Sequence, residues 1–285
     1  MIYIVFAIIC SVIVSVNFKL LNRYYTNAYQ AIVFNYPTAA IFCYFFFKPD
    51  LSNIPTYQNW LLFSVVAVLL ISIFYFIGKS IATSGIVLTA IAQRLSLVIP
   101  VAAAFLIFSE TTSTLKMIGL VIGFVALYIS KPKGETKLKE MVSWYPIIVF
   151  LGTGILDILF NLLTQINNIS FTASLVYIFS ISAIIGFSTL IIQYLKGDLK
   201  FEIKAALAGI VLGIFNFGSI YFYLKALKLE SNQPSVVFSS LDIGVIFLGS
   251  LVGIVLFKEK LSKLNTIGLI LALIAIVILN LPNAI

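Results

Sequence analysis

The feature that most constrains this chain is a series of ten long apolar runs that follow one another from end to end. They cover residues 2–21, 28–47, 60–81, 84–108, 115–131, 145–165, 171–195, 204–227, 233–257 and 263–281. A helix needs about 20 apolar residues to cross the ~30 Å hydrocarbon layer of a bilayer. No stretch alternates over ~10 residues as the strands of a membrane barrel do. The runs therefore predict an all-α integral membrane protein with ten transmembrane helices.

The amino-acid composition excludes several classes of protein. Of the 285 residues, 61% are hydrophobic and 10% are charged, whereas soluble chains average roughly half apolar and a quarter charged. A chain of 31.5 kDa cannot enclose that much apolar side chain, so lipid must cover most of its surface. The net charge of +8 does not indicate nucleic-acid binding, because the bases lie at the ends of apolar runs rather than in one exposed stripe.

Histidine is absent, and the two cysteines, Cys10 and Cys43, both lie inside apolar runs. This excludes zinc and haem sites, catalytic triads built on histidine and a disulfide framework. We therefore expect no metal and no cofactor. The first apolar run lacks the basic region and the small-residue cleavage site of a signal peptide, so we interpret it as a retained membrane span.

The second half of the sequence repeats landmarks of the first half in the same order. At a separation of 144 residues, Val5-Phe6 and Asn17 match Val149-Phe150 and Asn161. At 146 residues, Tyr75-Phe76 and Lys79 match Tyr221-Phe222 and Lys225. At 149 residues, Glu110, Gly119 and Ala126 match Glu259, Gly268 and Ala275. Three ordered sets of matches favour an internal repeat over chance.

We expect residues 1–130 to form the first five-helix repeat, the polar stretch 131–144 to be a linker, and residues 145–285 to form the second repeat. Because five is odd, the two repeats must cross the membrane in opposite senses. Inverted repeats are typical of secondary transporters, whose substrate site lies near the bilayer midplane between the repeats.

The motifs of residues 205–281 resemble an EamA-type repeat of the drug/metabolite transporter superfamily. They are a Ser-Asn-Gln-Pro start of the ninth run and the segments Lys225-Ala226-Leu227, Phe257-Lys258-Glu259 and Asn265-Thr266-Ile267-Gly268. The first half is similar through Pro100, Phe108-Ser109-Glu110 and Ile118-Gly119, but Ser15-Val16-Asn17 stands where family members commonly carry a Trp-Gly pair. The resemblance implies a ten-helix membrane transporter that exports or exchanges small organic metabolites.

The side of the membrane that the termini face is left open by two arguments that disagree. Basic residues are concentrated in the connections that follow odd-numbered runs, and the positive-inside rule then puts both termini outside. The resemblance implies termini in the cytoplasm. A chain without long loops or a targeting extension is typical of a bacterial cytoplasmic (inner) membrane.

Three ionisable residues lie deep inside apolar runs: Arg94, Asp157 and Asp242. Such residues are costly in lipid and are therefore candidates for a functional site. Arg94 and Asp242 occupy nearly equivalent positions in the two repeats. Arg94 could clamp an anionic group of a substrate, to which its planar fork is suited, or it could form an ion pair with Asp242 that holds the halves together.

A polar stripe follows the sixth run, because Thr153, Asp157, Asn161 and Gln165 recur every four residues and share one helix face. This pattern indicates a water-filled cavity or hydrogen bonds between helices. Asn17, which matches Asn161 in the repeat, is expected to face it. Arg94 can neutralise one carboxylate only, so Asp157 or Asp242 is a candidate for binding a coupling proton.

Lys79 and Lys225 each lie one turn beyond a tyrosine, Tyr75 and Tyr221, on the same helix face. As a pair related by the repeat, they could guard the two mouths of a path and attract anions. Alternatively, they are lysines at helix ends whose ammonium groups reach the lipid headgroups.

The leading hypothesis is a secondary transporter, not an enzyme, that moves a small organic metabolite, one with an anionic group, by alternating access. Its expected partners are the substrate, the bilayer and protons, and it would act as a monomer or homodimer without nucleic acid. An intramembrane enzyme that uses Asp157 and Asp242 for general acid–base work is the alternative, although the surrounding motifs do not match those of aspartyl membrane proteases. A passive channel is the third possibility.

Overall fold

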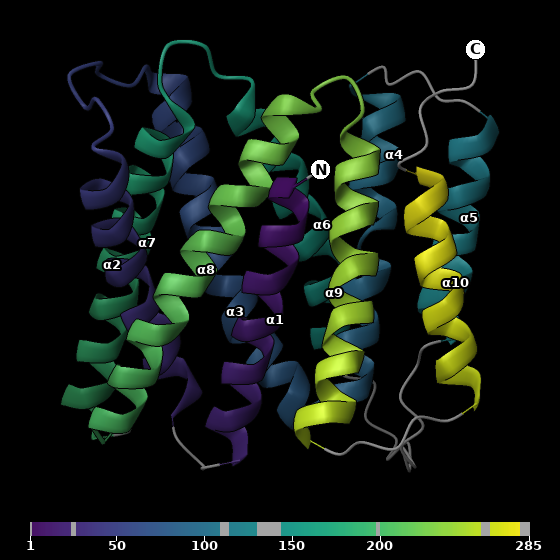
Figure 1. Cartoon of the computed structure of the whole chain (residues 1–285). Helices are drawn as coiled ribbons and strands as arrows, with labels where there is room; N and C mark the ends of the chain where they lie inside the picture. Colours follow the sequence, from purple (N-terminus) through teal and green to yellow (C-terminus); the bar gives the residue numbers. More distant parts are fainter. Residues whose placement is uncertain are drawn as a thin grey trace.

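The computed structural model describes residues 2–23, 27–108, 114–129, 144–197, 200–257 and 263–279. The regular secondary structure in these ranges is helical, and the helices lie side by side in one bundle (Figure 1). They are α1 (Ile2–Arg23), α2 (Ala28–Phe47), α3 (Tyr57–Leu95), α4 (Val98–Leu106), α5 (Thr114–Ile129), α6 (Tyr145–Thr164), α7 (Phe171–Leu195), α8 (Ile203–Leu229), α9 (Pro234–Phe257) and α10 (Lys263–Leu279).

Six helical segments in the described residues are long and apolar enough to cross a bilayer. They are Ala28–Phe47, Tyr57–Ser80, Tyr145–Thr164, Phe171–Leu195, Ile203–Leu229 and Pro234–Gly253. The prediction of an all-α membrane protein is confirmed at this level. Ten spanning helices go beyond this finding, because α4, α5 and α10 have 9, 16 and 17 residues, fewer than the about 20 that a span requires.

The boundary between the third and fourth helices differs from the prediction. A break at residues 82–83 was expected, but α3 continues for 39 residues to Leu95, and the break is the turn at Ser96 and Leu97. The Ser96 hydroxyl donates to the Gln93 carbonyl oxygen at 2.5 Å. Pro100 is the third residue of α4, where the missing N–H would have had no helical partner. The predicted boundary is therefore wrong, whereas the other eight helices agree with their runs to within two residues.

Polar residues at several helix ends explain where those helices begin and stop. The Asn27 side chain accepts a hydrogen bond from the backbone N–H of Gln30 at the start of α2, and Ser170 does the same for Ala173 at the start of α7. Such caps satisfy backbone donors that have no partner in the first helical turn. Gly197, with φ of 77°, follows α7 and adopts a left-handed conformation that glycine tolerates.

The helices are arranged so that elements distant in sequence are neighbours. In Figure 1, α2 and α7 lie at one end of the bundle and α5 and α10 at the other. Within the bundle, α1 packs against α8 and α9, α2 against α7 and α8, α3 against α6 and α7, and α4 against α6 and α9. The buried apolar side chains form one large cluster across these interfaces.

Glycines allow α2 and α8 to approach closely. A Cβ atom on Gly209 would lie 2.5 Å from the Ala31 carbonyl oxygen, and one on Gly213 would lie 2.6 Å from the Asn35 carbonyl oxygen. The two glycines are four residues apart and share one face of α8. At the same interface the Asn216 amide donates to the Asn35 side-chain oxygen at 3.1 Å.

Gly123 of α5 and Gly249 of α9 differ in how closely a neighbouring helix approaches them. A Cβ atom on Gly123 would lie 2.7 Å from Ile243 of α9, so this glycine does permit a close approach between helices. A Cβ atom on Gly249 would meet nothing within 4 Å. Gly249 therefore does not lie at a close helix contact.

Candidate functional site

Two of the deep acidic residues lie in one group with a tyrosine that the sequence analysis did not select. The Tyr223 hydroxyl of α8 donates a hydrogen bond to Oδ1 of Asp157 on α6 at 3.2 Å. Asp242 of α9 lies close enough to interact electrostatically with both. We call Asp157, Tyr223 and Asp242 the Asp157 cluster. It joins three helices through side chains that the sequence separates by up to 85 residues.

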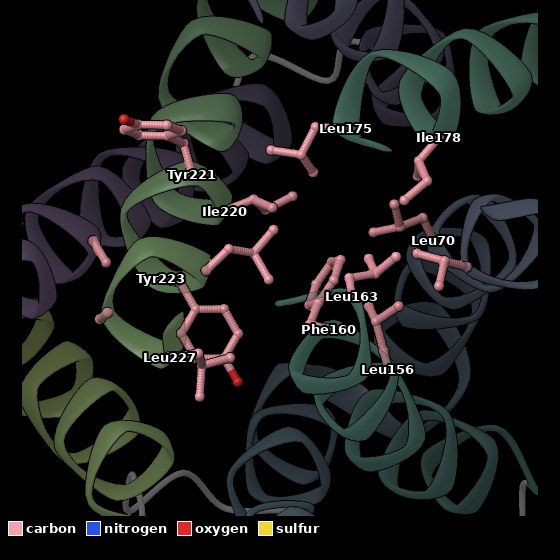
Figure 2. Packing of buried hydrophobic residues seen from close by; sticks show 14 of the residues in the cluster. Leu70, Leu156, Phe160, Leu163, Leu175, Ile178, Ile220, Tyr221, Tyr223 and Leu227 are labelled. Atoms are coloured by element: carbon pink, nitrogen blue, oxygen red, sulfur yellow. The ribbon is translucent and has the colours of Figure 1, made fainter. Parts of the chain in front are cut away.

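Aromatic rings enclose the tyrosine of the Asp157 cluster. The Tyr223 ring lies 6.2 Å from that of Phe160 on α6, in an edge-on arrangement, and 6.3 Å from that of Phe238 on α9. All three side chains are buried. Figure 2 shows the Tyr223 hydroxyl directed toward the side of α6 that carries Leu156 and Phe160. The Tyr223 hydroxyl group therefore lies next to Asp157 while its ring is packed in apolar surroundings.

The polar stripe of α6 is present in the structure for three of its four residues. The Thr153 hydroxyl and the Asn161 amide nitrogen are buried and have no hydrogen-bond partner in the described part of the chain. Asp157 lies between them and accepts from Tyr223. Gln165 is different, because it follows the last residue of α6 and its side chain is exposed.

A second polar stripe lies on α9. Ser235, Ser239 and Asp242 are spaced by four and three residues and so share one helix face. Ser235 and Ser239 are buried, and the Ser239 hydroxyl has no hydrogen-bond partner among the residues described. On both α6 and α9, a buried polar side chain that lacks a hydrogen-bond partner in the described residues thus lies one helical turn from an acidic residue.

Glycines in α6 bring Asp157 close to α3 and α4. A Cβ atom on Gly152 would lie 2.9 Å from Ile73 of α3, and one on Gly154 would lie 2.6 Å from Ile99 of α4. Larger residues at these positions would push α6 away from its neighbours. The position of Asp157 therefore depends on small residues three and five positions earlier in the same helix.

Asn17 does not face Asn161. Its amide donates to the Ala208 carbonyl oxygen of α8 at 3.3 Å. Ala208 and Tyr223, which contacts the α6 stripe, are 15 residues apart on α8, or about 22 Å along a helix. The expectation that Asn17 belongs to the α6 stripe is therefore wrong, because its amide bonds to α8 far from the residue that contacts Asp157.

Tyr221 and Lys225 lie on another side of α8. The Tyr221 ring packs against Phe47 of α2 at 4.2 Å and Phe171 of α7 at 5.5 Å. The Lys225 ammonium group lies 4.4 Å from the centre of the Tyr3 ring of α1 and 3.5 Å from the Tyr221 hydroxyl. The structure therefore does not bring these residues together with the Asp157 cluster.

Tyr75 and Lys79 of α3 repeat part of this arrangement. The Lys79 ammonium group lies 5.5 Å from the centre of the Tyr75 ring, as Lys225 lies 5.7 Å from that of Tyr221. The shared helix face predicted for both pairs is confirmed. Tyr75 is 41% exposed, whereas Tyr221 is 8% exposed, so the two environments are unequal. A role for either lysine in attracting anions stays a prediction.

Arg94 lies near the end of α3, but its side chain is outside the described part of the structure. Its two interpretations, a clamp for an anion and an ion pair with Asp242, both stay predictions. In the ranges that the structure describes, no three Cys, Asp or Glu side chains gather as a metal site would require.

Tyr223 was not among the residues predicted from the sequence, although the sequence carries a signal for it. At the separation of 146 residues that matches Tyr221 to Tyr75, Tyr223 matches Ile77. Tyr223 therefore brings a hydroxyl group to a position that is apolar in the first half, and this difference could have drawn attention to it.

The long apolar helices define the chain as a multi-pass helical membrane protein. One chain of known crystal structure aligns with 98% of this chain and 95% of its own length, with a TM-score of 0.72 and 9% sequence identity. At this identity the likeness concerns the fold alone.

No protein-family model matches the sequence. An uncharacterized protein of Haemophilus influenzae is 40% identical over 281 residues, which cover 95% of each chain. This chain belongs to the same family as that protein.

Proposed function

We propose that the protein is a secondary transporter of the EamA type, which moves a small organic metabolite by alternating access between two inverted five-helix halves. The packing of the helices supports this proposal. If each helix number is advanced by five, the pair α1–α8 becomes α6–α3, α1–α9 becomes α6–α4, and α2–α8 becomes α7–α3, and all of these pairs are in contact. The pairs α2–α7 and α5–α10 map onto themselves. A two-fold relation between the halves would produce this pattern.

The single observation that carries a transport function is the Asp157 cluster itself. Carboxyl groups inside membrane-spanning helices are costly and usually mark a pathway for a substrate, an ion or a proton. Asp157 and Asp242 come from α6 and α9, and both lie in segments apolar enough to span. A coupling site at the interface of these helices explains why two carboxyl groups lie there. Packing alone would be served by apolar side chains.

A proton is the coupling ion that these residues fit. Asp157 is surrounded by Tyr223 from α8 and Asp242 from α9, while α4 carries no titratable side chain and α3 carries Arg94. A carboxyl group in such a place can bind and release a proton as its exposure changes between two conformations. The proposed cycle therefore exchanges a proton for the metabolite.

The test is transport by the purified protein in proteoliposomes with an imposed pH gradient, with proton movement followed by an internal dye across a panel of metabolites. We expect saturable, substrate-dependent proton flux in the natural protein and its loss in Asp157→Asn. Asp50→Asn is the matched control, because it also removes one negative charge but lies in an exposed loop. Hydrogen bonds from Ser52 hold the pKa of Asp50 below its usual range, so that this group is ionised near neutral pH.

Other outcomes would contradict the proposal. Flux that neither saturates nor shows counterflow indicates a passive channel. A lack of flux with every metabolite, in protein that is folded and inserted, rejects transport.

The proximity of the two carboxyl groups favours one further candidate, an intramembrane enzyme. Paired carboxyl groups suit general acid–base catalysis. Here the Tyr223 hydroxyl donates a hydrogen bond to one carboxyl oxygen of Asp157. General acid–base catalysis would need that oxygen to contact a water molecule or the substrate. Cleavage of a membrane-embedded peptide library that is lost in both Asp157→Ala and Asp242→Ala would establish this function instead.

A further inference from the structure

The Asp157 cluster brings two acidic side chains from different helices into one apolar environment. Asp157 and Asp242 interact electrostatically, and like charges in apolar surroundings repel strongly unless a positive charge or a proton neutralises them. The deep residue Arg94 has one positive charge, so it can neutralise only one of the two. The other carboxylate can accept a second cation.

Buried polar groups beside the two acids point to a bound molecule. Asn161 is 2% exposed and Ser239 is 0% exposed, and the amide nitrogen of one and the hydroxyl of the other have no hydrogen-bond partner among the described residues. Asn161 lies one turn from Asp157 on the same face of α6, and Ser239 lies one turn from Asp242 on the same face of α9. Native proteins rarely bury such groups without a partner, so a ligand or water is expected there. The Ser239 hydroxyl oxygen can accept a hydrogen bond from a ligand, whereas the Asn161 amide nitrogen is a donor and needs an acceptor such as a water oxygen.

The same region has an apolar, aromatic wall. Phe160, Tyr223 and Phe238 present three buried rings, with Tyr223 6.2 Å from Phe160 and 6.3 Å from Phe238. Aromatic rings pack against apolar groups and attract cations to their faces. Carboxylates next to aromatic rings suit a molecule with a positive head and an apolar body.

We propose that the Asp157 cluster, with Phe160, Phe238 and Ser239, binds an organic ammonium ion that has an apolar body. The ammonium group has three donors, and the carboxylates of Asp157 and Asp242 and the hydroxyl oxygen of Ser239 supply three acceptors. The claim that this ion is the transported substrate rests on the proposed transport function. The claim that the ion binds at this site does not. The proposed ligand is a cation, whereas a clamp at Arg94 would select an anion.

The test compares two probes that differ in the sign of their charge. Benzylammonium and benzoate have the same aromatic ring and carry one positive and one negative charge at neutral pH. The thermal unfolding of the full chain in detergent is measured at rising concentrations of each probe, since a ligand that binds the folded state raises the melting temperature. We expect benzylammonium to raise it in a saturable manner and benzoate to have no effect.

Substitutions then locate the site. We expect Asp157→Asn and Asp242→Asn each to weaken the apparent affinity for benzylammonium by about tenfold or more, and Asp50→Asn in the exposed loop to leave it unchanged. Tyr223→Phe, which keeps the ring and the fold, is expected to weaken it less. The proposal is overturned if benzoate alone stabilises the protein, if neither probe does, or if both Asp→Asn variants respond as the natural protein does.

The result is independent of transport. If benzylammonium binds through Asp157 but no substrate moves in proteoliposomes, the binding site is established and the transport proposal fails. If metabolites are transported but benzylammonium does not bind, transport stands and the ammonium site is rejected.

Discussion

Tyr221 and Tyr223 are two residues apart on α8 and lie in opposite surroundings. Two residues correspond to about 200° around a helix, and Figure 2 shows the two rings pointing away from each other. Tyr221 packs among Phe47, Phe171 and Phe217 with Lys225 beside it. Tyr223 lies between the rings of Phe160 and Phe238 with its hydroxyl on Asp157. One tyrosine is part of the packing, and the other is part of the candidate site.

The two tyrosines also differ in whether the first half of the sequence carries a matching residue. Tyr221 and Lys225 recur as Tyr75 and Lys79, and both lysines lie over the ring of their tyrosine. By contrast, the separations found in the repeat match Asp157, Tyr223 and Asp242 to Ile13, Ile77 and Gln93. Asp157 and Tyr223 thus have apolar counterparts in the first half, whereas the counterpart of Asp242 is a polar residue.

The largest expected effect separates the two tyrosines by stability. Tyr221→Ala removes a ring packed against several others, and we expect the free energy of unfolding to fall by about 3–5 kcal/mol, as for buried aromatic residues in general. Tyr75→Ala is the matched control and should have a clearly smaller effect, because that ring is 41% exposed. Denaturant titration of both variants in detergent measures the difference. Equal losses would show that the exposure of the two rings does not decide their contribution.

A second prediction concerns Asp157, whose substitution should impair activity and spare the fold. We expect Asp157→Asn to reduce proton-coupled exchange by at least about 10- to 100-fold. An amide cannot bind the coupling proton, and the loss of a hydrogen bond to a charged group alone corresponds to about 1.5–3 kcal/mol. The melting temperature should stay close to that of the natural protein. Exchange assays and thermal unfolding on the same preparation check both parts. Unchanged exchange in this variant would remove Asp157 from the mechanism.

Removal of one hydroxyl group at a time sharpens the comparison. Tyr223→Phe breaks the bond to Asp157, and we expect exchange to fall by about fivefold, which corresponds to about 1 kcal/mol for one hydrogen bond, together with a shift in the pH dependence of exchange. Tyr221→Phe should leave both unchanged, because its ring contacts persist. The pH profile of exchange in the two variants is the measurement. A shift in Tyr221→Phe and none in Tyr223→Phe would reverse the assignment.

The smallest effect is expected at the lysines that the sequence analysis placed at the mouths of a path. Lys225→Met removes the contact with the Tyr3 ring, and we expect a loss of about 0.5–1 kcal/mol in unfolding free energy, as for cation–aromatic contacts near a surface. Lys79→Met should lose no more. Unfolding curves measure this, and the initial rate of substrate exchange serves as a second reading. A large fall in exchange with unchanged stability would instead support a role for these lysines in attracting substrate.

Apolar run length predicted most of the fold. Eight of the ten runs correspond to helices within two residues, because a membrane-spanning helix must satisfy its own backbone hydrogen bonds and bury apolar side chains over a fixed thickness. The break between α3 and α4 was misplaced, since residues 82–83 carry no strong helix breaker and the turn at Ser96 is fixed instead by its own hydrogen bond to Gln93 and by contact with Gly154 of α6. These interactions depend on the packed structure and leave no periodic pattern in the sequence.

The candidate site was predicted in part. Asp157 and Asp242 could be selected from the sequence because ionisable groups inside apolar runs are rare and costly. Tyr223, Ser239 and Phe238 could not be selected by composition, because tyrosine, serine and phenylalanine are common in membrane helices. Asn17 was included wrongly, since a match in a repeat does not imply contact, and in this structure it donates to Ala208 of α8.

The sequence by itself determined that the chain is helical, that it is solvated by lipid, and that it repeats its landmarks, because these properties depend on the order of apolar and polar residues along one chain. Only the tertiary structure decided which side chains meet. Asp157 and Tyr223 are 66 residues apart, and their hydrogen bond exists because glycines let α6 and α8 take their positions among α2, α3 and α4. Packing geometry of this kind is set by the shapes of several helices at once, and no local stretch of sequence encodes it.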